Sequence, residues 1–275
     1  MKKKIALIIS LVIFVALCFV FNKYDLDISI YLTKYHNGFS KFFAVYGECP
    51  IYIGPILFGA TLYYLTKKLW QKYTCTGITY IAYLIASIKV IHNKGLHLDL
   101  NNIMLAICVA ILLTLITFMI FSKIKRENLN KFKDLAFLWF VVSLASVSIT
   151  EVLKCLWGRV RFRDLSNDYS EFTKLFHING YNGNKSFPSG HTNAGTTILV
   201  LALITPRFTD KKWVKYLVTV LCFTYILCLQ VARIMASAHY ASDVLCGFVV
   251  SFTTLCVTYK IMKRKGIINV AGNKC

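Results

Sequence analysis

The sequence predicts an all-α protein, a polytopic membrane helix bundle of about eight spans with both termini in the cytoplasm. Hydrophobic residues make up 57% of the 275 residues, and the mean hydropathy is +0.58. These residues gather in long uncharged runs, such as residues 5–21 and 103–122. A helix rises about 1.5 Å per residue and must cross roughly 30 Å of hydrocarbon, so runs of this length indicate membrane-spanning helices.

Eight apolar runs follow one another along the chain. They cover residues 5–22, 48–66, 74–92, 103–122, 134–157, 188–206, 213–234 and 240–262. The third run is the weakest, because Lys89 falls inside it. The first run has an alternative interpretation as a cleaved signal peptide, but no small-x-small cleavage site follows it, so we expect it to remain as the first span.

Positive charge is clustered in alternate gaps between these runs. The formal net charge is +20, from 32 Lys and Arg against 12 Asp and Glu. Cytoplasmic loops are enriched in Lys and Arg, so the alternation predicts eight spans with both termini inside. The charges form no single basic face, and we expect no nucleic-acid partner. The clusters are Lys2, Lys3 and Lys4; Lys67, Lys68 and Lys72; Lys123, Lys125, Arg126, Lys131 and Lys133; Arg207, Lys211, Lys212 and Lys215; and Lys260, Lys263, Arg264 and Lys265.

Two segments on the predicted outer side are long. Residues 23–47 mix apolar and charged residues, which suits a helix lying in the membrane interface. Residues 158–187 are polar and glycine-containing, and we expect a structured loop there. We therefore divide the chain into residues 1–133, N-terminal transmembrane segments with an interfacial helix near 23–47, and residues 134–275, a C-terminal transmembrane core.

The ten cysteines do not indicate a disulfide framework. Most lie inside apolar runs, where a free cysteine behaves as a small hydrophobe. No spacing of Cys and His is typical of a zinc site. We predict no essential disulfide and no metal site.

The first polar cluster ends the fifth run at the predicted outer face. Lys154 and Arg161 are seven residues apart, so both face one way if the helix continues. Basic residues commonly extend toward water from a membrane edge. On the outer side, however, basic residues are disfavoured. Four of them lie close together here and indicate an anion, namely Lys154, Arg159, Arg161 and Arg163. Glu151 is placed to neutralise Lys154 at i, i+3.

The second cluster, Pro188-Ser189-Gly190-His191, opens the sixth run. Proline at the first helical position is a start signal, and the amides of the following turn have no helical partner. Such a helix start binds anions, and Gly190 allows close approach of the backbone. His191 adds a group that titrates near neutrality. The alternative is an ordinary helix cap with an interfacial histidine.

The third cluster links the last two runs and contains Arg233, His239 and Asp243. His239 and Asp243 are four residues apart, which places them on one face if both are helical. A carboxylate beside a histidine fixes its tautomer and stabilises the imidazolium. Arg233 is off that face, so we expect a turn between it and His239. The alternative is a structural His–Asp pair, although ionisable groups at membrane depth are usually functional.

Together the clusters supply what phosphoryl transfer requires. That reaction needs positive charge around the phosphoryl oxygens, an in-line nucleophile and an acid for the leaving oxygen. No pair of carboxylates suited to a metal is present, so arginine and lysine would replace Mg²⁺. We therefore expect a metal-independent enzyme without a cofactor.

These motifs closely resemble those of the type 2 phosphatidic acid phosphatase superfamily, over about residues 134–262. The superfamily pattern is K-x6-R-P, then P-S-G-H, then S-R-x5-H-x3-D. Two positions depart from it, since Phe162 replaces the first motif's proline and Ala232 the third motif's serine. The family usually has six spans, so residues 74–122 would be two additional ones. The matching residues are Lys154 and Arg161; Pro188, Ser189, Gly190 and His191; and Arg233, His239 and Asp243.

The resemblance implies a role for each matched residue. His239 would be the nucleophile that forms a phosphohistidine, with Asp243 orienting it, and His191 would be the general acid. Water would then hydrolyse the intermediate. The phosphate would be held by Lys154, Arg161, Arg233, Ser189 and the Gly190 amide.

The expected function is that of a lipid phosphatase in a bacterial inner membrane, with its active site facing the periplasm. We favour a lipid A phosphate as substrate, followed by undecaprenyl pyrophosphate, phosphatidylglycerophosphate and phosphatidic acid. One alternative is a lipid-to-lipid phosphotransferase of the same family, which differs only in the acceptor. An alternative of another class is a membrane transporter or a catalytically inactive scaffold. The sequence predicts no oligomeric state.

Overall fold

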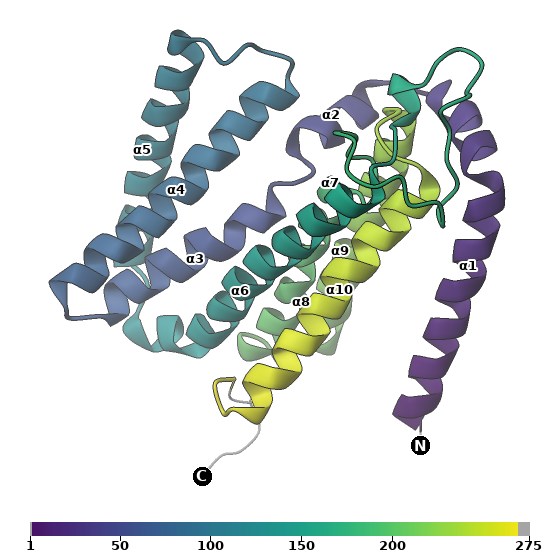
Figure 1. Cartoon of the computed structure of the whole chain (residues 1–275). Helices are drawn as coiled ribbons and strands as arrows, with labels where there is room; N and C mark the ends of the chain where they lie inside the picture. Colours follow the sequence, from purple (N-terminus) through teal and green to yellow (C-terminus); the bar gives the residue numbers. More distant parts are fainter. Residues whose placement is uncertain (1, 269–275) are drawn as a thin grey trace.

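The computed structural model describes residues 2–268, and this part of the chain is a bundle of α-helices without strands (Figure 1). The all-α class is confirmed. Residue 1 and residues 269–275 lie outside the described residues. The cytoplasmic location of both termini stays a prediction. The helices are α1 (Lys2–Thr33), α2 (Gly38–Tyr46), α3 (Pro50–Leu65), α4 (Leu69–Asn93), α5 (Leu100–Ser122), α6 (Arg126–Trp157), α7 (Gly190–Thr196), α8 (Val200–Ile204), α9 (Lys212–Met235) and α10 (Ala241–Arg264).

Seven segments among the described residues are long and apolar enough to cross a membrane. They correspond to all the predicted spans except the sixth, at 188–206. That run is broken into α7, the 3-10 turn Thr197–Leu199, α8 and the 3-10 turn Thr205–Arg207. Threonine hydroxyls bond backbone carbonyls within it, as in the 2.8 Å bond from Thr197 to Ala194, and such bonds compete with regular helix. The count of eight spans stays a prediction.

Residues 23–47, where we predicted an interfacial helix, are divided between two helices, and their position in the membrane interface stays a prediction. Residues 23–33 continue α1, and two of their polar side chains are buried within the protein. Asp25 and Ser29 are fully buried, and Ile28 packs against the start of α10. A separate short helix, α2, begins after Asn37, whose side chain accepts hydrogen bonds from the amides of the first turn.

The central core lies between α6, α9, α10 and the broken run 190–207. Trp139 and Leu138 of α6 are fully buried there, against Val200 and Ile226. In lipid, helices associate through close van der Waals packing and therefore need small residues at their contacts. Gly54 of α3 provides such a contact, since an added Cβ would lie 2.8 Å from the Trp139 carbonyl. The N-terminal helices thus pack directly onto the core.

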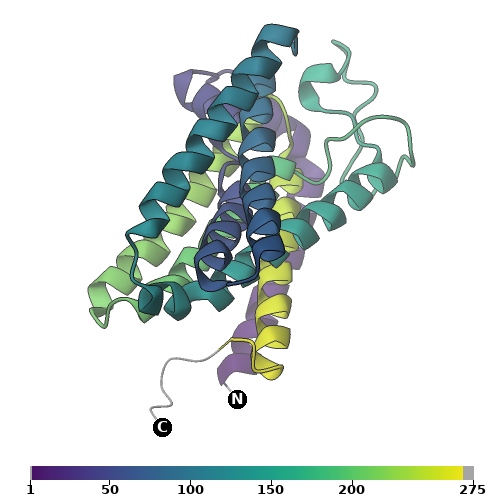
Figure 2. The same ribbon diagram turned by 90° about the vertical axis from the view of Figure 1, so that its left-hand side faces the viewer.

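Helices α4 and α5 form a hairpin on one side of this core (Figures 1 and 2). α4 packs mainly along α3 and α5. The long connection 158–187 is a structured loop, as expected, because Trp157 donates to the Leu175 carbonyl at 2.8 Å and Asn179 to the Trp157 carbonyl at 3.1 Å. This loop covers the ends of α6 and α10 at the side opposite the beginning of α1 (Figure 1).

The contact of α3 with α6 predicts the effect of adding one methyl group. Gly54→Ala forces its Cβ against the Trp139 backbone, so we expect a loss of about 1–3 kcal/mol in the free energy of unfolding. Thermal unfolding in detergent measures it. Gly77→Ala in α4 is the control, because no atom lies within 4 Å of its added Cβ, and helix propensity alone should give up to about 1 kcal/mol of stabilisation. Equal effects of the two substitutions would contradict the predicted contact.

Candidate active site

The three polar clusters meet at one cavity of about 860 Å³. Ser189 and Asp243 are fully buried and lie behind its wall. The other six predicted site residues line the cavity: Lys154, Arg161, Gly190, His191, Arg233 and His239. The structure therefore brings together residues from three elements that are distant in the sequence.

Lys154 and Arg161 reach the cavity from different kinds of backbone. The two side chains would share one helix face only if the helix continued, but α6 ends at Trp157, and Gly158 takes a left-handed conformation at φ 53°. Glycine is the usual residue at such a helix end. Arg161 therefore extends from the loop, whereas Lys154 lies in the last helical turn. Lys154 donates to Glu151 at 2.6 Å, as its spacing predicted.

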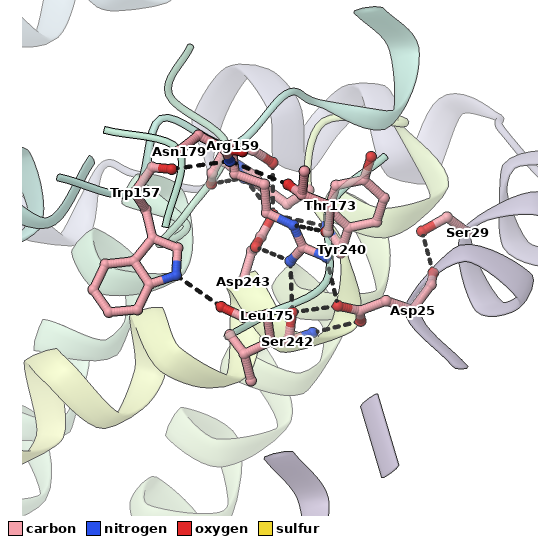
Figure 3. A network of polar contacts seen from close by, with 12 residues as sticks. Asp25, Ser29, Trp157, Arg159, Thr173, Leu175, Asn179, Tyr240, Ser242 and Asp243 are labelled. Atoms are coloured by element: carbon pink, nitrogen blue, oxygen red, sulfur yellow. Dashed lines mark hydrogen bonds and ion pairs between the residues drawn. The ribbon is translucent and has the colours of Figure 1, made fainter. Parts of the chain in front are cut away.

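Arg159, which the sequence grouped with basic residues expected to face an anion, is instead fully buried in a network of ion pairs (Figure 3). Its side chain is inaccessible to solvent and pairs with Asp25 of α1 at 3.0 Å and Asp243 of α10 at 2.7 Å. It also donates to the Thr173 carbonyl at 2.9 Å and to the Ser242 hydroxyl at 2.8 Å. Asp25, an acidic residue next to a long apolar run, could have indicated a buried ion pair. Because we assigned residues 23–47 to the membrane interface, we did not look for a basic partner of Asp25.

The second motif forms a different helix start from the one expected. Pro188 precedes the helix, and a cis peptide joins it to Phe187. Ser189 is the N-cap and accepts from the Thr192 amide at 3.3 Å. Gly190 is the first helical residue, and a Cβ there would lie 3.0 Å from the Lys154 ammonium nitrogen. Glycine at this position therefore lets Lys154 approach the helix start.

His239 is not on the helix face that we predicted for it. It precedes α10, after a turn in which Ser237 has a positive φ of 55°, and this confirms the expected turn after Arg233. Its Nδ1 lies 2.7 Å from the Ser186 carbonyl and 3.8 Å from Asp243. A carbonyl only accepts, so Nδ1 carries the proton and Nε2 keeps the lone pair. Asp243 acts through Ser186, whose hydroxyl donates to it at 2.6 Å.

Comparisons with known proteins concern the part of the chain that holds these residues. Residues 136–267 match the PAP2 superfamily. The match contains all eight predicted site residues, and it confirms the resemblance to the type 2 phosphatidic acid phosphatases.

Two curated relatives are similar to about half of the chain. A protein named Lipid A 1-phosphatase from Rhizobium johnstonii is 30% identical over 137 residues, 48% of this chain and 50% of the relative. A protein of the same name from Rhizobium etli is 29% identical over 133 residues, 47% and 51% of the two chains. The chain thus spans about half the length of the curated relatives it matches. No solved structure matches the chain.

Within the region that matches the PAP2 superfamily, positive charge faces the cavity without full compensation. Arg233 is nearly buried, and the Nε atoms of Arg161 and Arg233 are buried without a hydrogen-bond partner among the described residues. Asn193 also lines the cavity, and its side-chain nitrogen is likewise buried without a hydrogen-bond partner among the described residues. Buried donors and charges of this kind are costly unless they are paired. The site therefore suits an anion with several oxygens, and Asn193 is a ligand candidate that the motifs omitted.

No group of three or more His, Cys, Asp or Glu among residues 2–268 is arranged to hold a metal ion. The carboxylates on the cavity wall, within that part of the chain, are Glu48 and Glu151. Glu151 is paired with Lys154. Metal independence of the reaction stays a prediction.

The buried guanidinium of Arg159 predicts a large stability effect. Arg159→Leu leaves the Asp25 and Asp243 carboxylates buried without their cation, which should cost about 3–5 kcal/mol in the free energy of unfolding. Adding Asp25→Asn should restore part of this loss, because one uncompensated charge is removed. Thermal unfolding in detergent checks both. Lys131→Ala, at an exposed pair with Glu127, is the control and should change stability by less than about 1 kcal/mol.

His239 should stay neutral far below the usual histidine range. Burial lowers the pKa of His239 to about 4, and the positive charge of Arg233 adds to the effect, although Asp243 opposes it. A lowered pKa means that the ring is neutral at neutral pH and gains a proton only as the pH falls toward 4. NMR titration of protein labelled with ¹⁵N-histidine, with His239→Gln for assignment, measures the midpoint. A midpoint at or above 6.5 would contradict this environment.

Proposed function

We propose that this protein is a metal-independent lipid phosphatase that hydrolyses a phosphorylated membrane lipid through a phosphohistidine intermediate. The observation that carries the proposal is the placement of His239. It is a neutral histidine whose Nδ1 proton is engaged by Ser186, and it lines a cavity rich in unpaired cationic donors. The curated relatives named Lipid A 1-phosphatase make a lipid A phosphate the favoured substrate.

In the first step, the His239 Nε2 lone pair attacks the phosphorus atom. The bond from phosphorus to the lipid oxygen breaks as the bond to Nε2 forms. Positive charge develops on the ring, and the Ser186 carbonyl and the Asp243 carboxylate beyond it stabilise that charge. His191, which lines the same cavity, donates a proton to the departing lipid oxygen.

In the second step, water attacks the phosphohistidine. His191, now deprotonated, accepts a proton from this water, and the bond from phosphorus to Nε2 breaks. The products are inorganic phosphate and neutral His239, so the cycle closes without a cofactor.

Lys154, Arg161 and Arg233 supply the positive charge that phosphoryl transfer needs. The Gly190 amide stands at the start of α7 beside Lys154. Ser189 supports the phosphate site from behind, because its hydroxyl is used in capping α7. Because the cations belong to the protein, a divalent metal is unnecessary.

The proposed location is a bacterial inner membrane, with the site at its periplasmic face. The positive-inside rule supports this orientation, because the basic loops lie at the opposite end of the bundle (Figure 1). The two curated relatives are bacterial. The cavity wall between α4 and α6 is apolar, with Ile81, Ile85 and Leu144 exposed, and this suits the acyl chains of a lipid.

Phosphate release by detergent-purified protein tests the function. We expect hydrolysis of one lipid in a panel of lipid A, undecaprenyl pyrophosphate, phosphatidylglycerophosphate and phosphatidic acid. His239→Ala should lower the rate at least about 10³-fold, because the nucleophile is lost. His177→Ala should leave it unchanged, since His177 is exposed in the loop 158–187 and does not line the cavity.

EDTA should leave phosphate release unchanged in the same assay, and vanadate should inhibit it. Loss of activity with EDTA would overturn metal independence. Phosphate appearing on a second lipid instead of in solution would identify a phosphotransferase. If phosphate is neither released nor transferred, the proposal that this protein is an enzyme is overturned.

A further inference from the structure

A second carboxylate lies beside the other histidine of the cavity. Glu48, in the connection from α2 to α3, has its Oε2 atom 3.9 Å from Nδ1 of His191, and both side chains are 15% exposed. Glu48 precedes the region that matches the PAP2 superfamily, and the matched motifs include no partner for His191. The role of Glu48 has to be inferred from the contacts around it.

The hydrogen bonds of His191 determine where its exchangeable proton resides. Nε2 lies 3.0 Å from the carbonyl oxygen of Ala44, which only accepts. Nε2 therefore carries the proton of the neutral ring. A second proton must bind at Nδ1, the nitrogen that faces Glu48. The proton that a general acid gives away is thus held next to this carboxylate.

Glu48 is itself held from behind. The side-chain amide of Asn93, near the end of α4, donates to Oε1 of Glu48 at 3.0 Å. This leaves Oε2 directed at His191. The contact links α4, in the additional hairpin of residues 69–122, to the wall of the cavity.

The other groups that act on His191 are mostly cationic. Lys154 from α6, Arg233 from α9 and His239 from the connection to α10 lie within electrostatic reach. Lys89 and His92 of α4 line the same cavity. Burial disfavours a protonated His191, and the positive charges of Arg233 and Lys154 add to this effect. His239 is neutral at neutral pH and contributes no charge there. Two described carboxylates, Glu48 and Glu151, line the cavity wall. Because Glu151 is paired with Lys154, Glu48 is the carboxylate whose negative charge can favour a protonated His191.

We propose that Glu48 is a positioning residue that holds the proton on Nδ1 of His191, so that His191 can act as the general acid. The inference rests on the proposed function. The distance of 3.9 Å exceeds a hydrogen bond, but catalytic contacts often shorten only when substrate binds. Glu48 stays ionised throughout, and the proton that moves to the lipid oxygen comes from His191. Through the hydrogen bond from Asn93, the hairpin of α4 and α5 helps to hold Glu48 beside His191.

Glu48→Gln is the main test, because glutamine keeps the size and can still accept from Asn93 but carries no charge. We expect the alkaline limb of the rate of phosphate release to move to lower pH by about 1–3 units. At pH 8, kcat should fall about 10- to 100-fold, within the range of general acid catalysis, with little change in KM. Glu48→Asp should restore part of the rate, whereas Asn93→Ala should show a smaller shift in the same direction.

A substrate with a better leaving group separates acid catalysis from a structural role. A nitrophenyl phosphate carrying an alkyl chain releases an oxyanion that needs no proton. Glu48→Gln should therefore slow it less than twofold, whereas a misfolded cavity would slow both substrates equally. An equal loss on both substrates would overturn the inference, and so would an unchanged pH profile.

Histidine NMR provides a readout that needs no activity. The titration midpoint of His191, assigned with His191→Gln, should be lower in Glu48→Gln than in the wild type by at least about one pH unit. If the wild-type protein hydrolyses no lipid, the proposed function fails, and this titration still decides whether Glu48 favours protonated His191. Identical midpoints in the two proteins would overturn the inference.

Discussion

The structure depends on one buried cation, the guanidinium of Arg159. A charge without solvent exposure is tolerated only when ion pairs and hydrogen bonds compensate it. Asp25 of α1 and Asp243 of α10 provide opposite charges, and the aromatic ring of Tyr240 lies 4.1 Å from the guanidinium carbon. Three segments must therefore meet at one point, since Arg159 is 134 residues from Asp25 and 84 from Asp243 in the sequence. This fixes how the first and last helices sit against the loop that follows α6.

The same interaction sets the geometry of the candidate nucleophile. One oxygen of Asp243 pairs with Arg159, and the other accepts from Ser186 and from the Tyr240 amide. Ser186 in turn accepts the His239 proton through its carbonyl. The orientation of His239 is therefore connected through Arg159 to Asp25, although α1 lies outside the region matched by the PAP2 superfamily.

The two histidines of the cavity face opposite requirements. His239 must be neutral to attack phosphorus, and burial among cations keeps it so. His191 must carry a proton in the same positively charged surroundings, and Glu48 is the described carboxylate beside it without a lysine partner. A phosphate group entering the cavity would satisfy the unpaired arginine donors and bring negative charge to both rings.

The sequence by itself determined the all-α membrane class and the residues of the three motifs, because long apolar runs and short spacings are local properties. It also predicted the Glu151–Lys154 contact, which lies within one helix. Only the tertiary structure decided that α1 continues to Thr33, that α6 stops at Trp157, and that His239 precedes its helix. It alone revealed the Arg159 and Glu48 contacts, since Arg159 and Asp25 are 134 residues apart, and Glu48 precedes α3 whereas His191 lies in α7. Such pairs form through helix packing, which no local spacing encodes.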